Sequence, residues 1–369
     1  MSPLRHQFKE SVESVLGIHL WTTRSFPFLH ARRRFLTVRL DLNNKCNLRC
    51  PMCYFALEDV RKLPAEEMSD RVLERLRREV WPRTQELWLS CAAEPLIAPR
   101  LKSALFQAKR SGVPEVVLVS NAVALTDEKA QWLIEAPLDA LVVSLDGASA
   151  AVYERVRPPA DFGKVIGAIE RLQAMKRRRG AARPSLRVAA AVMMRENLAE
   201  WADIVRLAAR LGADLVSLNP RVYFEEMGEA DRLSDHWDEV NAALERARGA
   251  AAECGISLTA PEPFRPPGSE FASSDGEDAR RWRRCLAPWT QIVVYPDGET
   301  LPCSELRNRR SFGNLERQSF REIFHGPAFR AMREELRRGR PDAACFACSC
   351  GQTSDLNDPR AFSSRAIHP

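Results

Sequence analysis

Alternation of short apolar runs with amphipathic helical patterns constrains the fold of this chain more than any other feature. From Phe35 onward, runs typical of strands alternate with segments whose apolar residues recur at helical spacing. The expected strands are Phe35–Leu42, Glu86–Ser90, Glu115–Ser120, Ala140–Leu145, Leu186–Met193 and Leu215–Asn219, and the expected helices are Ala65–Val80, Arg100–Ser111, Thr126–Glu135, Phe162–Arg178 and Leu198–Leu211. Parallel strands joined by right-handed crossover helices predict an α/β protein with a partial (β/α)6 TIM-like barrel, which binds ligands at the carboxyl ends of its strands.

Three cysteines follow the first expected strand at once. The stretch LDLNNKCNLRCPMCY places Cys46, Cys50 and Cys53 on one short loop. Thiolates bind soft iron, and a cubane of four irons takes four cysteines, so three cysteines leave one iron open. A zinc knuckle is the alternative, but it requires a fourth Cys or His, and Cys91 is the only further candidate in residues 41–100. The loop therefore favours an iron-sulfur cluster.

The C-x3-C-x2-C spacing, the aromatic Tyr54 after the last cysteine and the preceding strand resemble the radical S-adenosylmethionine (radical SAM) enzymes. In that family the amino and carboxylate groups of the cofactor fill the open iron site. Further segments follow expected strands in the family's order: SCAAEP at 90–95 resembles its Gly-rich motif ending in Glu, Ser120-Asn121 its T-N-G turn, Ser144 to Gly147 its S-x-D-G segment, and Arg157 its carboxylate-binding arginine. The resemblance implies that S-adenosylmethionine is bound by Tyr54, Ala92, Ala93, Glu94, Asn121, Ser144, Asp146 and Arg157.

Ala92 and Ala93 depart from the family's pattern, which has Gly at these positions. Methyl groups are tolerated there if the backbone avoids positive φ. Glu94 is retained, and in the family this carboxylate and the neighbouring backbone receive the ammonium group of the cofactor. Arg157 suits a carboxylate because a guanidinium group offers a planar fork of donors.

A second group of cysteines lies near the C-terminus. It comprises Cys285, Cys303, Cys345, Cys348 and Cys350. The stretch CLAPWTQIVVYPDGETLPC predicts two short strands around a Pro-Asp-Gly hairpin with a cysteine at each end. With an expected helix at Phe320–Arg338 and the final CFACSC, this region resembles a shortened, twitch-like SPASM domain. The resemblance implies one auxiliary 4Fe-4S cluster on Cys285, Cys303, Cys345 and Cys348, with Cys350 competing for the last place. A zinc ribbon is the alternative, which the neighbouring radical SAM loop disfavours.

Changes of composition divide the chain into five expected segments. They are an N-terminal extension at 1–34, the barrel core at 35–220, a helix at Ser234–Glu253 with a Pro/Gly/Ser-rich linker within 221–284, the auxiliary cluster domain at 285–350, and a tail at 351–369. The extension is too short for a leader-peptide-binding domain. Cys254, at the end of a helix, is interpreted as a buried structural thiol, and Cys91 as a packing residue.

The composition restricts the expected cellular location of the protein and its expected binding partners. The sequence shows no secretory signal and no transmembrane segment, which predicts a cytoplasmic protein whose ten cysteines serve metal sites rather than disulfides. The formal charge of +6 arises from arginine-rich runs without interleaved aromatic residues, so nucleic-acid binding is not expected. An acidic or phosphorylated substrate stays possible.

The function follows from the resemblance. It implies that an electron donor such as flavodoxin or ferredoxin reduces the first cluster, that S-adenosylmethionine is cleaved to a 5′-deoxyadenosyl radical, and that this radical takes a hydrogen atom from the substrate. The auxiliary cluster would accept an electron or anchor the substrate. A small molecule or sugar that is oxidised or epimerised is the favoured substrate, and maturation of a ribosomally made peptide is the alternative. A zinc-stabilised, non-catalytic binding protein is the alternative from another class. The sequence identifies no catalytic acid, base or hydrogen donor.

Overall fold

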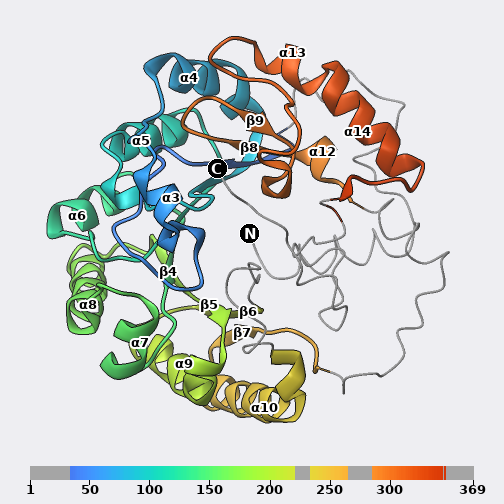
Figure 1. Cartoon of the computed structure of the whole chain (residues 1–369). Helices are drawn as coiled ribbons and strands as arrows, with labels where there is room; N and C mark the ends of the chain where they lie inside the picture. The colour runs from blue at the N-terminus through green and yellow to red at the C-terminus, as the bar shows by residue number, and fades with distance from the viewer. Residues whose placement is uncertain (1–33, 221–232, 265–284, 344, 346–369) are drawn as a thin grey trace, which may run out of the picture.

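The computed structural model describes residues 34–220, 233–264, 285–343 and 345 (Figure 1). The N-terminal extension up to residue 33, most of the Pro/Gly/Ser-rich linker, Cys348, Cys350 and the C-terminal tail lie outside the described residues.

Nine strands of the described residues form one open, mostly parallel sheet in the order β7-β6-β5-β4-β3-β2-β1-β8-β9. Their bounds are β1 (Leu36–Leu40), β2 (Thr84–Leu89), β3 (Glu115–Ser120), β4 (Ala140–Ser144), β5 (Ser185–Met193), β6 (Leu215–Pro220), β7 (Ser257–Thr259), β8 (Gln291–Val294) and β9 (Thr300–Leu301). All neighbours from β7 to β8 pair in parallel, and β9 is antiparallel to β8. The six expected strands are confirmed, with ends that differ by at most two residues.

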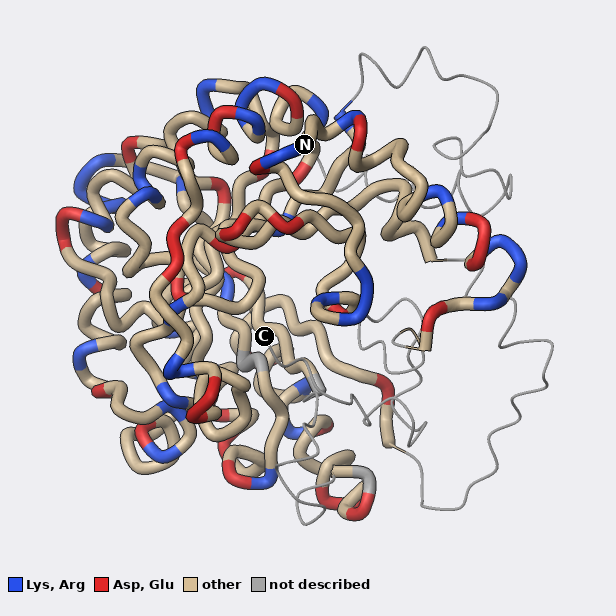
Figure 2. The backbone as a smooth tube through the Cα atoms, turned by 45° about the horizontal axis from the view of Figure 1, so that its top comes forward, with Lys and Arg blue, Asp and Glu red and all other residues tan. Residues whose placement is uncertain are grey.

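The crossover helices cover the outside of this sheet, where they form an arc in Figure 1. The helices of the first part are α3 (Glu58–Lys62), α4 (Asp70–Arg75), α5 (Leu101–Arg110), α6 (Asp127–Glu135), α7 (Ala150–Val156), α8 (Phe162–Arg178), α9 (Trp201–Arg210) and α10 (Trp237–Cys254). Side chains cap several of them: Ser69 accepts from the backbone N–H of Val72 at the start of α4, and Asp161 accepts from that of Lys164 at the start of α8. Lys and Arg alternate with Asp and Glu over these outer helices (Figure 2).

Two expected helices start later than predicted. The helix expected from Ala65 begins only at Asp70, since Asn43 and Glu67 form an isolated bridge and Ser69 caps the helix; a π-helical turn, η2 (Leu76–Val80), then extends α4. Where a helix was expected from Leu198, the chain first forms the 3-10 turn η5 (Arg195–Glu200), and the α-helix α9 starts only at Trp201. Boundaries are less determined by local pattern than the elements themselves.

The C-terminal region adds α12 (Ala287–Thr290), the 3-10 turn η9 (Ser304–Leu306), α13 (Phe320–Phe324) and α14 (Pro327–Arg337). The prediction of a single helix at Phe320–Arg338 is wrong, because the helix is interrupted at Gly326 and two helices form instead. A Cβ atom on Gly326 would lie 2.5 Å from the carbonyl oxygen of Glu322, and Pro327 opens the next helix at a position where no N–H is needed.

The same region also extends the sheet. β8 pairs in parallel with β1, from Thr37 opposite Gln291 to Leu40 opposite Val294. Ile292, Val293 and Val294 are fully buried in the apolar core that contains β1. The segment 291–301 is thus packed on the barrel core through a shared sheet.

Two further expectations are settled by burial. Cys254 is exposed at the end of α10, so its interpretation as a buried thiol is wrong; Gly255, at φ = +64°, ends the helix as expected. Cys91 is half-buried and packs against the core. Among the described residues, no helix has the length and apolar character that crossing a membrane requires.

Candidate functional site

The cysteine loop, residues 41–53, connects the carboxyl end of β1 to the 3-10 turn η1 (Tyr54–Ala56). Leu48 and Met52 are buried and anchor it to the core. The backbone N–H of Arg49 donates to the carbonyl oxygen of Pro158 at 2.7 Å, and that of Cys53 donates to Cys50 at 2.9 Å. The loop is therefore held in place at the strand end, with its three thiols on one short, folded segment.

Burial dominates the electrostatics of these three thiols. It raises the pKa of Cys46 to about 12 and that of Cys50 to about 11, and it also raises the pKa of Cys53. The charge on Cys53 raises the pKa of the other two further, so the thiols lie near one another, while Arg157 lowers the pKa of Cys50 and Cys53. A bound metal supplies the positive charge that buried thiolates need, so this donor set fits an iron-sulfur cluster.

No three His, Cys, Asp or Glu side chains of the described residues are placed to hold a single metal ion. A four-iron cluster places its ligands differently, because each iron takes its own thiolate. The absence of a site for a single metal ion among the described residues is therefore compatible with a four-iron cluster on the cysteine loop.

Asn121, at the carboxyl end of β3, contacts the cysteine loop directly. Its Nδ2 donates to Oδ1 of Asn47 at 2.8 Å and lies 3.9 Å from the sulfur of Cys46. Its own Oδ1 accepts from the backbone N–H of Val123, which stabilises a turn in which Ala122 has φ = +60°. This left-handed conformation favours glycine, as expected for a turn that resembles T-N-G.

Glu94 is 3% exposed and follows β2. Its carboxylate accepts hydrogen bonds from Ser120 Oγ at 2.7 Å and from the backbone N–H groups of Asn121 and Leu96, both at 2.9 Å. Burial raises the pKa of Glu94, and these donors oppose the rise. The carboxylate thus joins the loops after β2 and β3, and its charge also acts on Cys46.

Arg157 and Asp146 form a buried ion pair. Both Nη2 and Nε of Arg157 contact Oδ2 of Asp146, at 2.6 and 2.7 Å. The other oxygen of Asp146 accepts from the backbone N–H of Val192. Gly147 makes this segment possible, because a Cβ atom there would lie 2.6 Å from the backbone nitrogen of Tyr153. Arg157 is therefore oriented by Asp146, close enough to lower the pKa of Cys50.

Of the remaining expected residues, Tyr54, Ala92 and Ala93 share a small apolar cluster with Cys46 and Cys53. Neither Ala92 nor Ala93 has positive φ, so their methyl groups meet the condition for replacing Gly. Ser144 ends β4 and is half-buried. Tyr54 stacks on Phe55 with a centroid distance of 4.5 Å.

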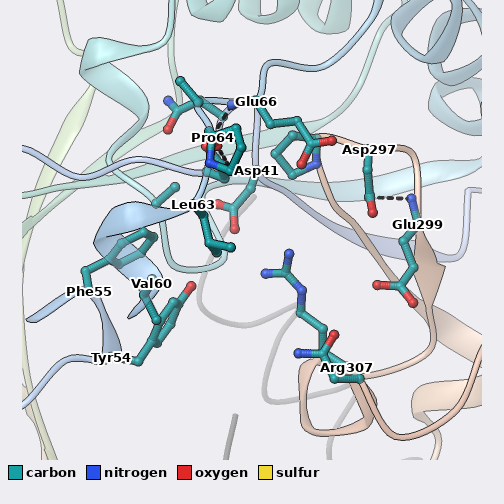
Figure 3. A pocket seen from close by; sticks show the side chains of 16 residues that line it. Asp41, Tyr54, Phe55, Val60, Leu63, Pro64, Glu66, Asp297, Glu299 and Arg307 are labelled. Carbon is teal, nitrogen blue, oxygen red and sulfur yellow. Dashed lines mark hydrogen bonds between the residues drawn. The ribbon is translucent and has the colours of Figure 1, made fainter. Parts of the chain in front are cut away.

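Three residues that the sequence analysis did not single out also belong to this region. Asp41 accepts from the backbone N–H groups of Cys91 at 2.7 Å and Ala92 at 3.2 Å. Asn197 is buried and donates to the carbonyl oxygens of Asp146 and Val192. Arg307 points toward Asp41 from the C-terminal region (Figure 3). The sequence shows that these residues follow expected strands or a cysteine. It does not show which distant groups they contact.

Of the expected auxiliary ligands, the structure describes Cys285, Cys303 and Cys345, all half-buried against the core. Cys303 follows β9, and Cys285 precedes α12, which leads into β8. The side chain of Gln291 donates to the carbonyl oxygen of Pro302, which joins the two ends of the hairpin near these cysteines. The Nε of Arg333 on α14 donates to Pro288 on α12, so the helix that leads to Cys345 packs on the same segment.

Comparison with known families matches two parts of the chain. The radical SAM superfamily matches residues 41–208, from the cysteine loop into α9. The SPASM family, described as an iron-sulfur cluster-binding domain, matches residues 285–349.

Individual proteins match over most of the chain. The PqqA peptide cyclase of Streptomyces rochei is 27% identical over 271 residues, which are 72% of this chain and 68% of that protein. The AdoMet-dependent heme synthase of Methanosarcina barkeri is 28% identical over 313 residues, which are 80% of this chain and 85% of that protein. Among solved structures, Streptococcus suis SuiB bound to S-adenosylmethionine has a TM-score of 0.61 at 13% identity and covers 89% of this chain and 78% of its own. At that identity the likeness concerns the fold alone.

Proposed function

The chain belongs to the radical SAM superfamily and carries a SPASM iron-sulfur domain, and from this we propose that it modifies a ribosomally made peptide. The observation that carries the proposal is the match to a PqqA peptide cyclase, which extends over 72% of this chain and therefore well beyond the segment that matches the superfamily. The alternative substrate of the sequence analysis thereby becomes the first candidate.

The family implies 4Fe-4S clusters and S-adenosylmethionine as cofactors. In this proposal Cys46, Cys50 and Cys53 hold the first cluster, and the two cofactors together supply radical chemistry that removes a hydrogen atom from an unactivated carbon. The chain's own contribution is to bind and orient: Arg157, fixed by Asp146, offers a guanidinium group to a carboxylate. Glu94 offers its buried negative charge to an ammonium group.

Tyr54, Ala92, Ala93, Asn121 and Ser144 complete the proposed cofactor site. They lie on the loops after β1, β2 and β3 and, for Ser144, at the last residue of β4, where the carboxyl ends of parallel strands meet. The buried setting of Glu94 and Arg157 keeps water away from the charged groups of the cofactor, which strengthens each contact.

We further propose that Cys285, Cys303 and Cys345 hold an auxiliary 4Fe-4S cluster, with Cys348 or Cys350 as the fourth ligand. In support, Cys285 precedes α12, Cys303 follows β9, and α14, which leads toward Cys345, packs on α12 through Arg333 and Pro288. A cluster there would accept an electron during oxidation or anchor the substrate.

An electron donor with an acidic surface, such as flavodoxin or ferredoxin, is the proposed redox partner. A cavity of about 450 Å³ has Cys46 in its lining, together with the four cations Lys45, Arg49, Arg61 and Lys62 and one carboxylate, Glu58. A positive rim around a cluster ligand favours docking of a negatively charged protein.

Oxidation or epimerisation of a small molecule or sugar is the second candidate. The specific observation in its favour is the match to a heme synthase over 80% of this chain. A zinc-stabilised protein without catalysis is the candidate from another class, and an anaerobically purified protein that is brown supports iron whereas a colourless one supports zinc.

The deciding experiment is co-expression with each short peptide encoded beside the gene, followed by mass spectrometry of the peptide. The proposal expects one peptide to lose two hydrogen atoms, and the same peptide to stay unchanged with a Cys46→Ala variant. If all neighbouring peptides stay unchanged while the purified enzyme still forms 5′-deoxyadenosine, the peptide proposal fails and the small-molecule candidate takes its place.

A further inference from the structure

A cavity of about 400 Å³ lies at the carboxyl ends of β1, β2 and β8, between the cysteine loop and the C-terminal region (Figure 3). One wall is apolar and aromatic and includes Tyr54, Phe55, Val60 and Leu63. The opposite side carries carboxylates from both parts of the chain, and Figure 3 shows Asp41, Glu66, Asp297 and Glu299 around the space. The cavity thus combines an apolar wall with an acidic one.

Asp41 is the most deeply placed of these carboxylates, since it is only 4% exposed. Its Oδ1 accepts both backbone hydrogen bonds, from Cys91 and Ala92. The backbone N–H of Ala93 also acts on the carboxylate, which is directed into the cavity in Figure 3. Burial raises the pKa of Asp41 to about 6, which reflects a negative charge that the surrounding protein does not fully compensate.

The charge of the lining is unbalanced. Its four carboxylates face one guanidinium group, that of Arg307, so the formal charge of the lining is −3. Within the described part of the chain, none of the four carboxylates has a Lys, Arg or His nitrogen within 4.0 Å. Burial raises the pKa of both Glu66 and Glu299, the charge on Asp297 raises it further, and Arg307 opposes the rise. A bound cation would relieve this repulsion.

Arg307 does not neutralise the cavity. Its guanidinium group lies over the ring of Tyr295, 3.8 Å from the centroid, and acts on Asp41 through space without forming an ion pair. Among the described residues it therefore leaves the carboxylate of Asp41 without an ion-pair partner.

We propose that this cavity binds a primary ammonium group on an apolar stem, as in a lysine side chain of the substrate. The stem would contact the wall at Phe55, Val60 and Leu63, and the ammonium group would donate to the carboxylate of Asp41, with the carboxylates of Glu66 and Glu299 around the same space. This inference rests on the proposed function in one respect only, namely that the substrate is a peptide.

The test measures binding to the reconstituted, iron-loaded full chain by isothermal titration calorimetry. The probes are the blocked peptide acetyl-Gly-Lys-Gly-amide and the same peptide with norleucine, which keeps the stem but lacks the charge. The lysine peptide should bind at least about tenfold more tightly, as expected for a charge-assisted hydrogen bond in a partly buried site. Equal affinity for the two peptides overturns the proposal.

Variants of the lining carboxylates test whether the preference for the lysine peptide arises in this cavity. Asp41→Asn and Glu299→Gln should each reduce the preference for lysine, and together they should abolish it. The matched control Glu128→Gln removes an exposed carboxylate on α6 and should leave both affinities unchanged. A lysine preference that persists in the double variant assigns the binding to another place and overturns the proposal.

Arg307→Gln distinguishes a cation from an anion as the ligand. Removing a like charge should strengthen binding of the lysine peptide, whereas loss of binding would mean that Arg307 recognises the ligand and would overturn the proposal. The substrate question is separate: failure of every neighbouring peptide as a substrate, with the lysine preference intact, refutes the proposed function and leaves the cation site standing.

Discussion

The guanidinium group of Arg157 contacts a single carboxylate oxygen of Asp146 from two nitrogens, Nη2 at 2.6 Å and Nε at 2.7 Å. Both side chains are buried, and the pair joins the end of α7 to the loop after β4. Arg157 is thereby turned toward the cysteine loop before any cofactor is present. Such preorganisation lowers the ordering cost of binding.

Breaking this pair should destabilise the protein strongly. Asp146→Asn leaves the buried charge of Arg157 without its counter-charge, and the free energy of unfolding should fall by about 3–5 kcal/mol. Chemical denaturation measures the change. Asp127→Asn is the control, because its ion pair with Arg171 is exposed and contributes about 0–1 kcal/mol. Similar small losses in both variants would show that the buried pair has no special role.

The three cysteines of the first loop should account for about half of the bound iron. Two Cys-ligated cubanes require about eight irons per chain, so replacement of Cys46, Cys50 and Cys53 by Ala should leave about four. The variant should form no 5′-deoxyadenosine. Iron and sulfide analysis together with chromatography of the reaction products checks both outcomes, and continued formation of 5′-deoxyadenosine would contradict the assignment of this loop.

The C-terminal cysteines should affect the product rather than the cleavage of the cofactor. Cys285→Ala together with Cys303→Ala should remove about four irons while the first cluster remains. The variant should then form 5′-deoxyadenosine slowly in strong reductant but accumulate no oxidised product. A normal yield of product would exclude a redox or substrate-binding role for this cluster. Because β8 and β1 share a sheet, thermal unfolding should be recorded beside activity.

Asp41 should make stability depend on pH in a defined direction. Burial raises its pKa from 3.8 to about 6, so the folded state favours the protonated carboxyl and loses stability as the pH rises between these values. Asp41→Asn keeps an acceptor for the N–H groups of Cys91 and Ala92. It should therefore raise the free energy of unfolding at pH 7, by up to about 3 kcal/mol, since one pKa unit corresponds to about 1.4 kcal/mol. The gain should vanish near pH 4.

Denaturant titrations at pH 4 and pH 7 measure the Asp41 effect, with Glu128→Gln as an exposed control. A gain of equal size at both pH values would contradict the electrostatic origin. The expected stability of Asp41→Asn also means that lost lysine binding in this variant would not result from unfolding.

Charge reversal around Cys46 should slow reduction by a protein donor. Arg49→Glu with Arg61→Glu changes two exposed side chains of the basic rim, and the rate of S-adenosylmethionine cleavage with flavodoxin or ferredoxin should fall about tenfold at low ionic strength. The rate with dithionite should stay the same, because a small reductant does not need the docking surface. Equal losses with both reductants would place these residues in the cluster site instead of at an interface.

Local patterns were sufficient to predict six strands and most of the helices between them. The run at 115–120 has the β-branched content of a buried strand, and the structure forms β3 over the same residues. The polar residues after β2, β3 and β4 were expected to meet because parallel strands end at one edge, and Glu94 indeed contacts both Ser120 and Asn121. Spacing alone also placed Cys46, Cys50 and Cys53 on one loop.

Contacts between segments that are distant in the sequence determined the remaining features of the site. That Arg157 is held by Asp146, that β8 extends the sheet beside β1, and that Asp41 faces Arg307 across a cavity depend on which distant segments come together. Periodicity and motif spacing are properties of neighbouring residues, so they determine which strands and loops form. The partner of a buried charge, in contrast, is determined by the tertiary fold, because burial makes an unpaired charge costly and only folding brings the compensating group within reach.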